Sequence, residues 1–427
     1  MAQTQHVPVL IVGGGIVGLS ASLFLSQHSI RHVLVEKHAG TSIHPRGRSV
    51  NARTMELYRS LGIDNAIREA GASLAPSQGI FPGPSLAVAI KPVAHKEGPK
   101  LNHFASLMDS ISPEQAQRGT QDAIEPVLVQ AAKEQGGDVR FHVECLGVKQ
   151  DENGIMGYVA ESRERRDERV EGGLLYCCRW CQEPDPGEAW GDLERKRNIG
   201  LHAKICVIDR PEARDLLTAI DNSYRWVFHL CYDPKKGEKV EDCPTERCVE
   251  ILRLVLGVPD VDIEIKSILP WKPSGKIVDK LQHGRIFLAG DAAHQMTPYA
   301  GQGANSGIAD VHNLAWKLAY VIKNQAKPAL LDTFDVERIP VGKAAVKVST
   351  IAADERGNLS LEKSFAAAKG LARRTIGPKG DLVDEKDKFL NAAGVSSKGA
   401  FLVRPDGLWL GAQGGSHPII KRVLQRL

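Results

Sequence analysis

Two short apolar runs near the N-terminus enclose a helical pattern. Residues 9–12 (Val-Leu-Ile-Val) are continuously apolar, which is typical of a strand buried on both faces of a parallel sheet. An apolar-periodic segment from Leu19 to Leu25 predicts a helix. Residues 32–35 (His-Val-Leu-Val) then predict a second strand, which ends at Glu36. The order of strand, helix and strand indicates a βαβ unit and an α/β fold.

The turn between the first strand and the helix is rich in glycine. Gly13, Gly15 and Gly18 fit the spacing Gly-x-Gly-x-x-Gly. Glycine at these places allows a tight turn and lets the main chain approach a pyrophosphate, which binds to N–H groups at the helix start. Glu36 follows Gly18 at the distance where a carboxylate accepts hydrogen bonds from ribose hydroxyls and repels a 2′-phosphate. The pattern predicts a dinucleotide site without choosing between FAD and NAD(P). A glycine turn that only packs is the alternative.

A second apolar pattern lies far downstream. Residues 284–294 (Gly-Arg-Ile-Phe-Leu-Ala-Gly-Asp-Ala-Ala-His) predict another buried strand, which closes on Gly-Asp. Pro298 and the glycine-rich residues 301–305 follow. Apolar or small residues then recur at spacings of three and four, which predicts a helix with Asn305 or Ser306 as its N-cap. These residues are Ile308, Val311, Ala315, Leu318 and Ile322.

Composition excludes several classes of protein. The 427 residues are enough for two or three domains at about 150 residues each. The formal net charge of +4 predicts neither a nucleic-acid footprint nor a polybasic membrane anchor. No apolar run reaches the roughly 20 residues that a membrane-spanning helix needs. The N-terminus lacks the basic start of a secretory signal, so we expect a cytoplasmic chain. The last residues, Gln-Arg-Leu, resemble a peroxisomal signal only faintly.

Together, these motifs resemble those of a known enzyme family. The glycine-rich start, Glu36, Gly-Asp-Ala-Ala-His and Pro-x-x-Gly-Gln-Gly-Ala-Asn are similar to the class A FAD-dependent aromatic monooxygenases. Within this p-hydroxybenzoate hydroxylase-like group, the chain resembles the phenol hydroxylase and polyketide hydroxylase branch. The resemblance implies an α/β fold: a Rossmann-like FAD-binding domain (GR2 type) with an inserted, mainly-β substrate domain.

The resemblance also implies domain boundaries. The expected segments are an FAD-binding part at 1–170 with a substrate-domain excursion at about 72–117, a disrupted segment at 171–200, a substrate-binding β-sheet region at 201–282, a second FAD-binding part at 283–357 and a thioredoxin-like remnant at 375–427. The remnant lacks a Cys-x-x-Cys pair, so no thiol redox activity is expected from it.

Particular residues are implied as the FAD site. Asp291 would bind the ribityl chain and Pro298 would lie beside the isoalloxazine ring. Main-chain N–H groups of residues 301–305 would face the pyrimidine edge, where the helix dipole favours the negative charge of reduced flavin. The full expected set is Gly13, Gly15, Gly18, Glu36, Lys37, Arg46, Arg118, Gln121, Asp291, Pro298, Gly301, Gly303, Ala304 and Asn305. His294 is as consistent with a structural role as with a catalytic one.

Three members of this set come from N-terminal segments that match the family. Arg46 precedes residues 51–57, which resemble the flavin-gating helix. Residues 118–126 resemble the loop and helix whose Arg and Gln, here Arg118 and Gln121, contact the adenosine phosphates and the ribityl chain. Without the family, the two arginines would be solvated surface charges and the glutamine an ordinary polar residue of a first helical turn.

One interval departs from the family. The family has an Asp-Gly turn after a buried strand, but residues 171–188 show neither strand nor helix periodicity. They hold Cys177, Cys178 and Cys181, three of the eight cysteines. A metal or redox site here lacks a second ligand pair at zinc spacing, and we expect no metal. An irregular loop peculiar to this chain is a second interpretation.

A third interpretation is a change of reading frame. Codons permitted for the residues from Cys177 onward, read one base later, can encode Ala-Ala-Asp-Gly-Ala-Lys-Ser-Pro-Ile-Arg-Glu-Lys-Leu-Gly, which is the missing motif. Its Gly is forced, because Trp180 has a single codon and a Cys codon begins with T. Our hypothesis is that residues 172–199 are translated out of frame, through a mispredicted intron or a frameshift.

The resemblance implies an FAD-dependent monooxygenase that acts on a phenolic or polyketide-like aromatic. In such enzymes NAD(P)H reduces the flavin, and O₂ then supplies one oxygen atom to the ring. NAD(P)H binds only transiently, a homodimer is compatible with the pattern, and we nominate no acid–base pair. Trp271 fits either the substrate pocket or the core. Two alternatives stay open: a non-catalytic homologue without the Asp-Gly motif, and an NAD-dependent dehydrogenase, which residues 290–294 argue against.

Overall fold

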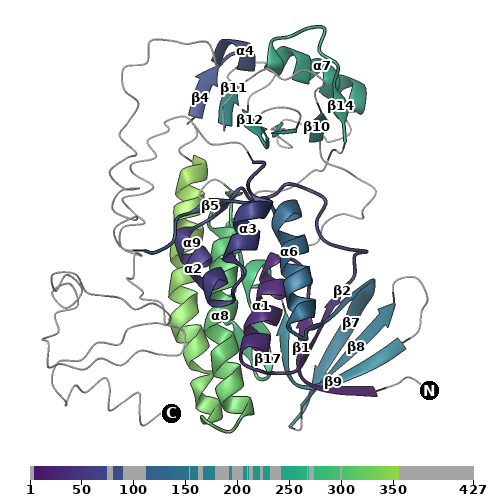
Figure 1. The fold of residues 1–427 in the computed structure, drawn as a ribbon, viewed down its shortest axis with the longest axis vertical. Coiled ribbons are helices and arrows are strands. Elements are labelled where there is room, and N and C mark those ends of the chain that lie inside the picture. Colours follow the sequence, from purple (N-terminus) through teal and green to yellow (C-terminus); the bar gives the residue numbers. More distant parts are fainter. Residues whose placement is uncertain are drawn as a thin grey trace, which may run out of the picture.

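The structure is a computed structural model in which two sheets organise the chain (Figure 1). It describes residues 4–74, 80–89, 112–152, 154–161, 167–177, 192–194, 205–208, 210, 215–221, 225–230, 242–266, 268, 274–298 and 301–354. Trp271, Cys178, Cys181 and the expected remnant at 375–427 lie outside the described residues. Within them, no helix is both long and apolar enough to cross a bilayer.

The larger sheet is built on parallel strands. Its central order is β16-β17-β9-β1-β2-β6, and β7 and β8 extend it from β9. The strands are β1 (Thr4–Val12), β2 (His32–Glu36), β6 (Asp138–Phe141), β7 (Val143–Gln150), β8 (Ile155–Glu161), β9 (Asp167–Cys177), β16 (Gln282–His283) and β17 (Ile286–Leu288). β1, β2, β6, β9 and β17 run parallel, so their carboxyl ends meet at one edge. Ligands of such folds bind at that edge.

The two faces of this sheet are covered differently. Val9 and Ile11 belong to a core with the helices α1 (Ile16–Gln27), α6 (Gln121–Glu134) and α8 (Gly303–Ile322). Leu10, one position along, packs instead with Ile155 and Val159 of β8. Successive side chains of a strand point to opposite faces, so an unbroken apolar run is what a sheet covered on both sides requires.

The smaller sheet lies at one end of the molecule (Figure 1). Its order is β14-β10-β13-β12-β11-β4. The strands are β4 (Ile80–Gly83), β10 (Asp192–Glu194), β11 (Ile205–Ile208), β12 (Asp215–Ala219), β13 (Trp226–Phe228) and β14 (Glu264–Ile265). The helices α4 (Leu86–Ala89) and α7 (Thr245–Leu256) pack on it around buried Trp226 and Leu217. β4 pairs in parallel with β11, so an N-terminal excursion joins a sheet formed mainly by later residues.

The remaining elements are short, apart from the C-terminal helix α9 (Thr333–Asp354). The short ones are β3 (Ser49–Val50), α2 (Ala52–Ser60), α3 (Asp64–Ala70), β5 (Gln117–Arg118), β15 (Lys276–Ile277), the 3₁₀ turn η3 (Gly290–Ala292), β18 (His294–Gln295) and the 3₁₀ turn η5 (Pro328–Leu330). β3 pairs with β5, and β15 pairs with β18. The mixed sheet, its helical cover and the second β-sheet confirm the expected fold class.

Two expectations about local structure were wrong. Residues 171–177 are not irregular: they complete β9, which pairs with β1 on one side and β17 on the other. Backbone pairing in mid-sheet forms this strand although its Gly-Gly pair weakens the apolar pattern. Asn305 and Ser306 are not the N-cap of α8, which begins at Gly303 with Gln302 as its cap. Asn305 uses its side chain in tertiary contacts instead.

Candidate cofactor-binding site

The glycine turn after β1 is so tight that main-chain atoms occupy the space where a side chain would lie. Gly13 has a φ of 112°, and its N–H donates to the carbonyl oxygen of Val35 at 2.9 Å, which joins the ends of β1 and β2. A Cβ on Gly18 would lie 1.9 Å from the carbonyl oxygen of Gly13. Gly15 caps α1 without a side-chain hydrogen bond. The three predicted glycines therefore form the tight strand-to-helix turn that the motif requires.

Glu36 lies at the end of β2, beside that turn. Its Oε2 accepts a hydrogen bond from the N–H of Gly14 at 2.6 Å, and its Oε1 accepts one from the N–H of His38 at 2.9 Å. These bonds orient the carboxylate, and each oxygen keeps a further acceptor position for a ribose hydroxyl. Lys37 follows it and is exposed.

The segments of Arg46, Arg118 and Gln121 meet through their main chains. The N–H of Gln121 donates to the carbonyl oxygen of Arg46 at 2.7 Å, and β3 pairs Ser49 with Arg118. The Arg118 guanidinium donates to the carbonyl oxygen of Leu74 at 3.0 Å. Residues separated by about 70 positions in the sequence thus form one unit at the edge of the larger sheet.

Glu125 is a site residue that the sequence analysis missed. It is 1% exposed, and its carboxylate accepts hydrogen bonds from Ser42 N–H at 2.7 Å and from Gln121 Nε2 at 2.5 Å. The N–H of Ile16, in the first turn of α1, also donates to it. Burial raises the pKa of this carboxyl. Its position one helical turn after Gln121 was the available signal, but a helical glutamate is usually solvated.

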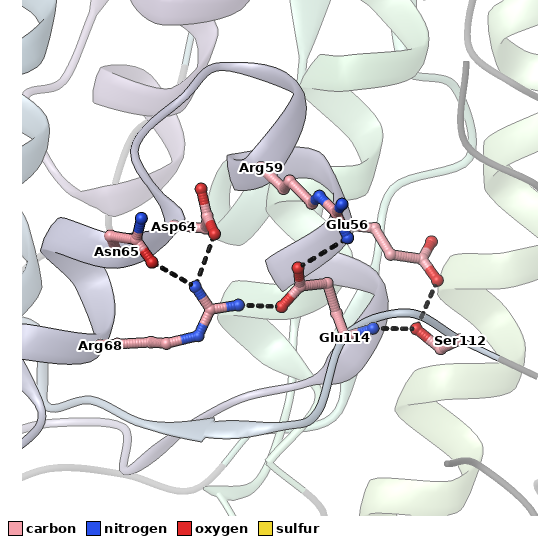
Figure 2. Close-up of polar contacts among 7 residues, drawn as sticks. All are labelled: Glu56, Arg59, Asp64, Asn65, Arg68, Ser112 and Glu114. Carbon is pink, nitrogen blue, oxygen red and sulfur yellow. Dashed lines mark hydrogen bonds and ion pairs between the residues drawn. The ribbon is translucent and has the colours of Figure 1, made fainter. Parts of the chain in front are cut away.

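Figure 2 shows a network of hydrogen bonds and ion pairs that links residues 112–114, just before β5, to α2 and α3. Buried Glu114 accepts hydrogen bonds from Arg59 of α2, at 3.3 Å, and from Arg68 of α3. Ser112 Oγ donates to Glu56 at 2.7 Å and accepts from the N–H of Glu114 at 3.1 Å. This network holds the approach to β5, and therefore the backbone that carries Arg118, against α2 and α3.

Asp291 lies just after β17, at the same edge of the larger sheet as the glycine turn. Burial raises the pKa of this carboxyl to about 6, and the nearby charges of His294 and Arg46 act in the opposite direction. Gly290, just before it, has a φ of 60°, and a Cβ there would lie 3.1 Å from the side chain of Val17 in α1. The Gly-Asp turn is therefore packed on the helix that follows the first glycine motif.

His294 is not at the open part of the site. It is 3% exposed, and its Nε2 lies 2.7 Å from Oδ2 of buried Asp310 in α8. Its pKa is raised: burial opposes protonation, but the hydrogen bond and the charge of Asp310 outweigh it. The structure therefore favours a structural role over a catalytic one.

The loop before α8 leaves open space. Pro298, Gly301 and Ala304 are exposed, and a Cβ on Gly301 or Gly303 would meet no heavy atom within 4 Å. α8 has no side-chain cap bond and no acidic residue in its first turn. Its N–H groups thus present the positive end of the helix dipole to a ligand.

The smaller sheet borders this site. Arg225, next to β13, donates to Oδ2 of Asp122 in the first turn of α6 at 2.9 Å. Burial lowers the pKa of His229 to about 4, with Arg48 contributing, and that of His44 to about 3, with Arg46 contributing. Both imidazoles are therefore neutral at pH 7, and the arginines supply the positive charge at this boundary.

The residues present fit FAD. A glycine turn at a helix start suits the pyrophosphate, oriented Glu36 suits the adenosine ribose, and the open, dipole-facing loop at 301–304 suits a flat ring that becomes negative on reduction. Cys177 ends β9 at this edge, in register with Val12 and Leu288. The residues expected to hold the Asp-Gly motif follow Cys177 in the sequence. They lie outside the described residues.

Comparison with known families gives the same assignment. The chain matches the FAD binding domain family over residues 6–178 and 195–349. The gap in the match, residues 179–194, falls inside the segment at 171–200 that was expected to be disrupted.

Several curated relatives and solved structures are similar to this chain. A Streptomyces halstedii protein assigned as a polyketide hydroxylase is 36% identical over 97% of this chain and 76% of its own length. The tetracenomycin A2 monooxygenase-dioxygenase of Streptomyces glaucescens is 34% identical over 80% of this chain, which spans 66% of that enzyme.

A ternary complex of aklavinone-11 hydroxylase with FAD and aklavinone superimposes with a TM-score of 0.72 at 27% identity, covering 82% of this chain and 69% of that one. The flavin-dependent monooxygenase PieE, in complex with FAD and substrate, gives a TM-score of 0.69 at 28% identity, covering 88% and 70%. The chain therefore belongs to the FAD binding domain family of flavin-dependent aromatic monooxygenases, and its cofactor is FAD.

Proposed function

We propose that this chain is an FAD-dependent hydroxylase of a fused-ring aromatic polyketide, with NAD(P)H as transient reductant and O₂ as the source of oxygen. One observation carries the proposal. Segments around Gly13, Arg46, Gln121, Asp291 and Gly301 converge at the carboxyl edge of the parallel strands, next to a second sheet. The relatives named above support the substrate class, since they include a polyketide hydroxylase and a tetracenomycin monooxygenase.

The chain's own residues supply binding, orientation and electrostatics. FAD, when bound, would supply the redox chemistry, with NAD(P)H as the reductant and O₂ as the source of oxygen. Gly13, Gly15 and Gly18 would hold its pyrophosphate, and Glu36 its adenosine ribose. Asp291 would accept hydrogen bonds from the ribityl hydroxyls. The N–H groups at the start of α8 would stabilise negative charge at the pyrimidine edge of the ring.

The substrate would lie between that ring and the smaller sheet. The Arg225–Asp122 ion pair links this sheet to α6 and would help to set the distance between substrate and cofactor. Positive charge at the boundary, from Arg46 and Arg48, favours the ionised form of a phenolic hydroxyl. Ionisation makes an aromatic ring more reactive toward an electrophilic oxygen. The homodimer expected from the sequence stays a prediction.

Isotope labelling tests this function. Purified chain loaded with FAD is supplied with NADH or NADPH, ¹⁸O₂ and a tetracyclic aromatic polyketide. We expect substrate-dependent oxidation of the nicotinamide and a product that contains one atom of ¹⁸O. Nicotinamide oxidation without any labelled product, at every substrate tested, would contradict the proposal.

A non-catalytic homologue is the second candidate, and the interruption of the family match at residues 179–194 favours it. This chain would then retain the fold and bind FAD weakly or not at all. The labelling experiment separates the two, because only the hydroxylase transfers ¹⁸O.

A further inference from the structure

We propose that Asp310 is a positioning residue, which holds the Gly290–Asp291 turn in the conformation that presents Asp291 to FAD. The inference rests on the proposed function, because it assigns a task within the same site. Asp310 lies in α8, does not face the open loop and is 1% exposed. A buried carboxylate destabilises the folded protein unless hydrogen bonds and opposite charges compensate it, so its partners indicate what it does.

The contacts of Asp310 join three separate segments. Its Oδ2 accepts from Nε2 of His294 at 2.7 Å and from the N–H of Gly290 at 3.3 Å. Its Oδ1 accepts from Nε of Arg338, in α9, at 2.7 Å. Arg338 also donates to the carbonyl oxygen of Ser306 at 3.3 Å. One carboxylate thus ties both ends of the Gly-Asp-Ala-Ala-His turn to α8 and α9.

The charges alternate along this network. Burial would raise the pKa of Asp310, but Arg338 and His294 outweigh it and lower the pKa, so Asp310 is ionised. Asp310 in turn raises the pKa of His294 against the effect of burial, and the positive charge of His294 lowers the pKa of Asp291. The order is therefore Arg338 positive, Asp310 negative, His294 with a raised pKa, and Asp291, whose pKa of about 6 leaves it negative at pH 7. Asp310 therefore supports the ionised Asp291 that accepts hydrogen bonds from ribityl hydroxyls.

The turn also packs closely against α1 and α8, and the contacts of Asp310 fix its orientation within that packing. Gly290 has a φ of 60°, in the left-handed region that favours glycine. A Cβ on Gly307 would lie 2.9 Å from the Cα of Gly290 and 2.6 Å from the side chain of Val17. Asp291 is the next residue, and a small rotation of the turn would move its carboxylate away from the cofactor.

The same two helices offer a matched control. Glu337 of α9 accepts a hydrogen bond from Asn313 at 2.9 Å and pairs with buried Lys317 at 3.1 Å, both in α8. Glu337→Gln removes a second α8–α9 charge contact without touching the Gly-Asp turn. A purely structural role for Asp310 would give similar results for Asp310→Asn and Glu337→Gln.

The test compares FAD affinity with thermal stability in the full chain. Both variants should lower the Tm of the FAD-free protein. Asp310→Asn should also weaken FAD binding about tenfold or more, as expected for the loss of charged hydrogen bonds, while Glu337→Gln should stay within about twofold. If Asp310→Asn does not fold, His294→Gln takes its place in the test. Glutamine keeps a donor to Asp310 but cannot carry a positive charge, so this variant should also weaken FAD binding.

A double-mutant cycle shows whether Asp310 acts through Asp291. In an Asp291→Asn background, the effect of Asp310→Asn on FAD affinity should largely disappear, because its target is gone. Additive effects, or equal weakening by Glu337→Gln, would overturn the inference while leaving the proposed function intact. A wild-type chain that binds no FAD would overturn both.

Discussion

Asn305 and Asn51 are 254 positions apart, yet Oδ1 of Asn305 accepts a hydrogen bond from the N–H of Asn51 at 3.0 Å. The same oxygen accepts from Oγ1 of Thr54 at 2.7 Å, and Nδ2 of Asn305 donates to the carbonyl oxygens of Gly301 and Ser49 at 3.0 and 3.3 Å. This side chain therefore joins the loop before α8 to the start of α2. The two regions expected to contact the flavin are held together by one amide.

We predict that Asn305→Ala lowers the free energy of unfolding by about 2 kcal/mol, because it leaves the buried hydroxyl of Thr54 and the partly buried N–H of Asn51 without their partner. Alanine suits a helix, so propensity does not explain a loss. Urea unfolding of the FAD-free chain measures it. Asn65→Ala serves as control, since Asn65 is exposed and bonds only to Arg68 among the described contacts. We expect the control to change stability by less than about 0.5 kcal/mol. Equal losses would contradict the structural role of Asn305.

The pKa of Asp291 predicts how FAD affinity depends on pH. The folded, FAD-free protein holds this pKa at about 6, above the ordinary 3.8. Below pH 6 the carboxyl therefore takes up a proton, so it loses its negative charge and one of its oxygens becomes a donor, which makes it a weaker acceptor for ribityl hydroxyls. FAD affinity should fall as pH decreases from 7 to 5, by up to about tenfold per unit below the pKa.

Titration of protein with FAD, followed by the quenching of flavin fluorescence, measures this dependence. Asp291→Asn should bind FAD more weakly at pH 7 and show a flatter profile from pH 7 to 5. If wild type and variant had the same profile, Asp291 would not be the titrating group.

The network of Figure 2 predicts that Glu114→Gln destabilises the protein. Glu114 is buried, whereas Arg59 and Arg68 are 48% and 33% exposed at their side chains, so water screens part of the loss. We expect a decrease of about 1 kcal/mol or more in unfolding free energy and weaker FAD binding, because β5 carries Arg118. Glu250→Gln, in an exposed pair with Arg247, is the control and should have almost no effect. Unfolding curves identical to those of wild type would show that the network does not anchor β5.

Much of the fold could be predicted from local patterns, and the site only in part. The apolar runs at 9–12 and 32–35 correspond to β1 and β2, and the periodicity after residue 308 corresponds to α8. A strand buried on both faces gives a continuous apolar run, whereas an amphipathic helix gives apolar residues at spacings of three and four. Glu125 and Asp310 could not be found in this way. Both are buried carboxylates on helices, and only tertiary contacts reveal the amides and cations that stabilise them.

β9 shows the opposite difficulty. Its backbone continues the sheet to Cys177, although its Gly-Gly pair and its mixed composition do not predict a strand. Pairing with β1 and β17 determines the structure there, and a local pattern carries no information about neighbours from residues 4–12 and 286–288.

The reading-frame hypothesis predicts a difference between two expressed chains. A chain in which the residues from Cys177 onward are replaced by the frame-shifted sequence regains the Asp-Gly motif directly after β9 in the sequence. We expect it to bind FAD more tightly than the present chain and to oxidise NAD(P)H faster with substrate. Transcript sequencing provides the independent check. An in-frame message that encodes Cys177, Cys178 and Trp180 would contradict the hypothesis.

The flavin content of the purified chain shows whether this protein binds FAD. After incubation with FAD and removal of the excess, absorbance and protein concentration give the number of flavins per chain. We expect one FAD per chain, with the absorbance of a protein-bound flavin. A chain that retains no FAD, and instead retains a nicotinamide dinucleotide, would contradict this expectation.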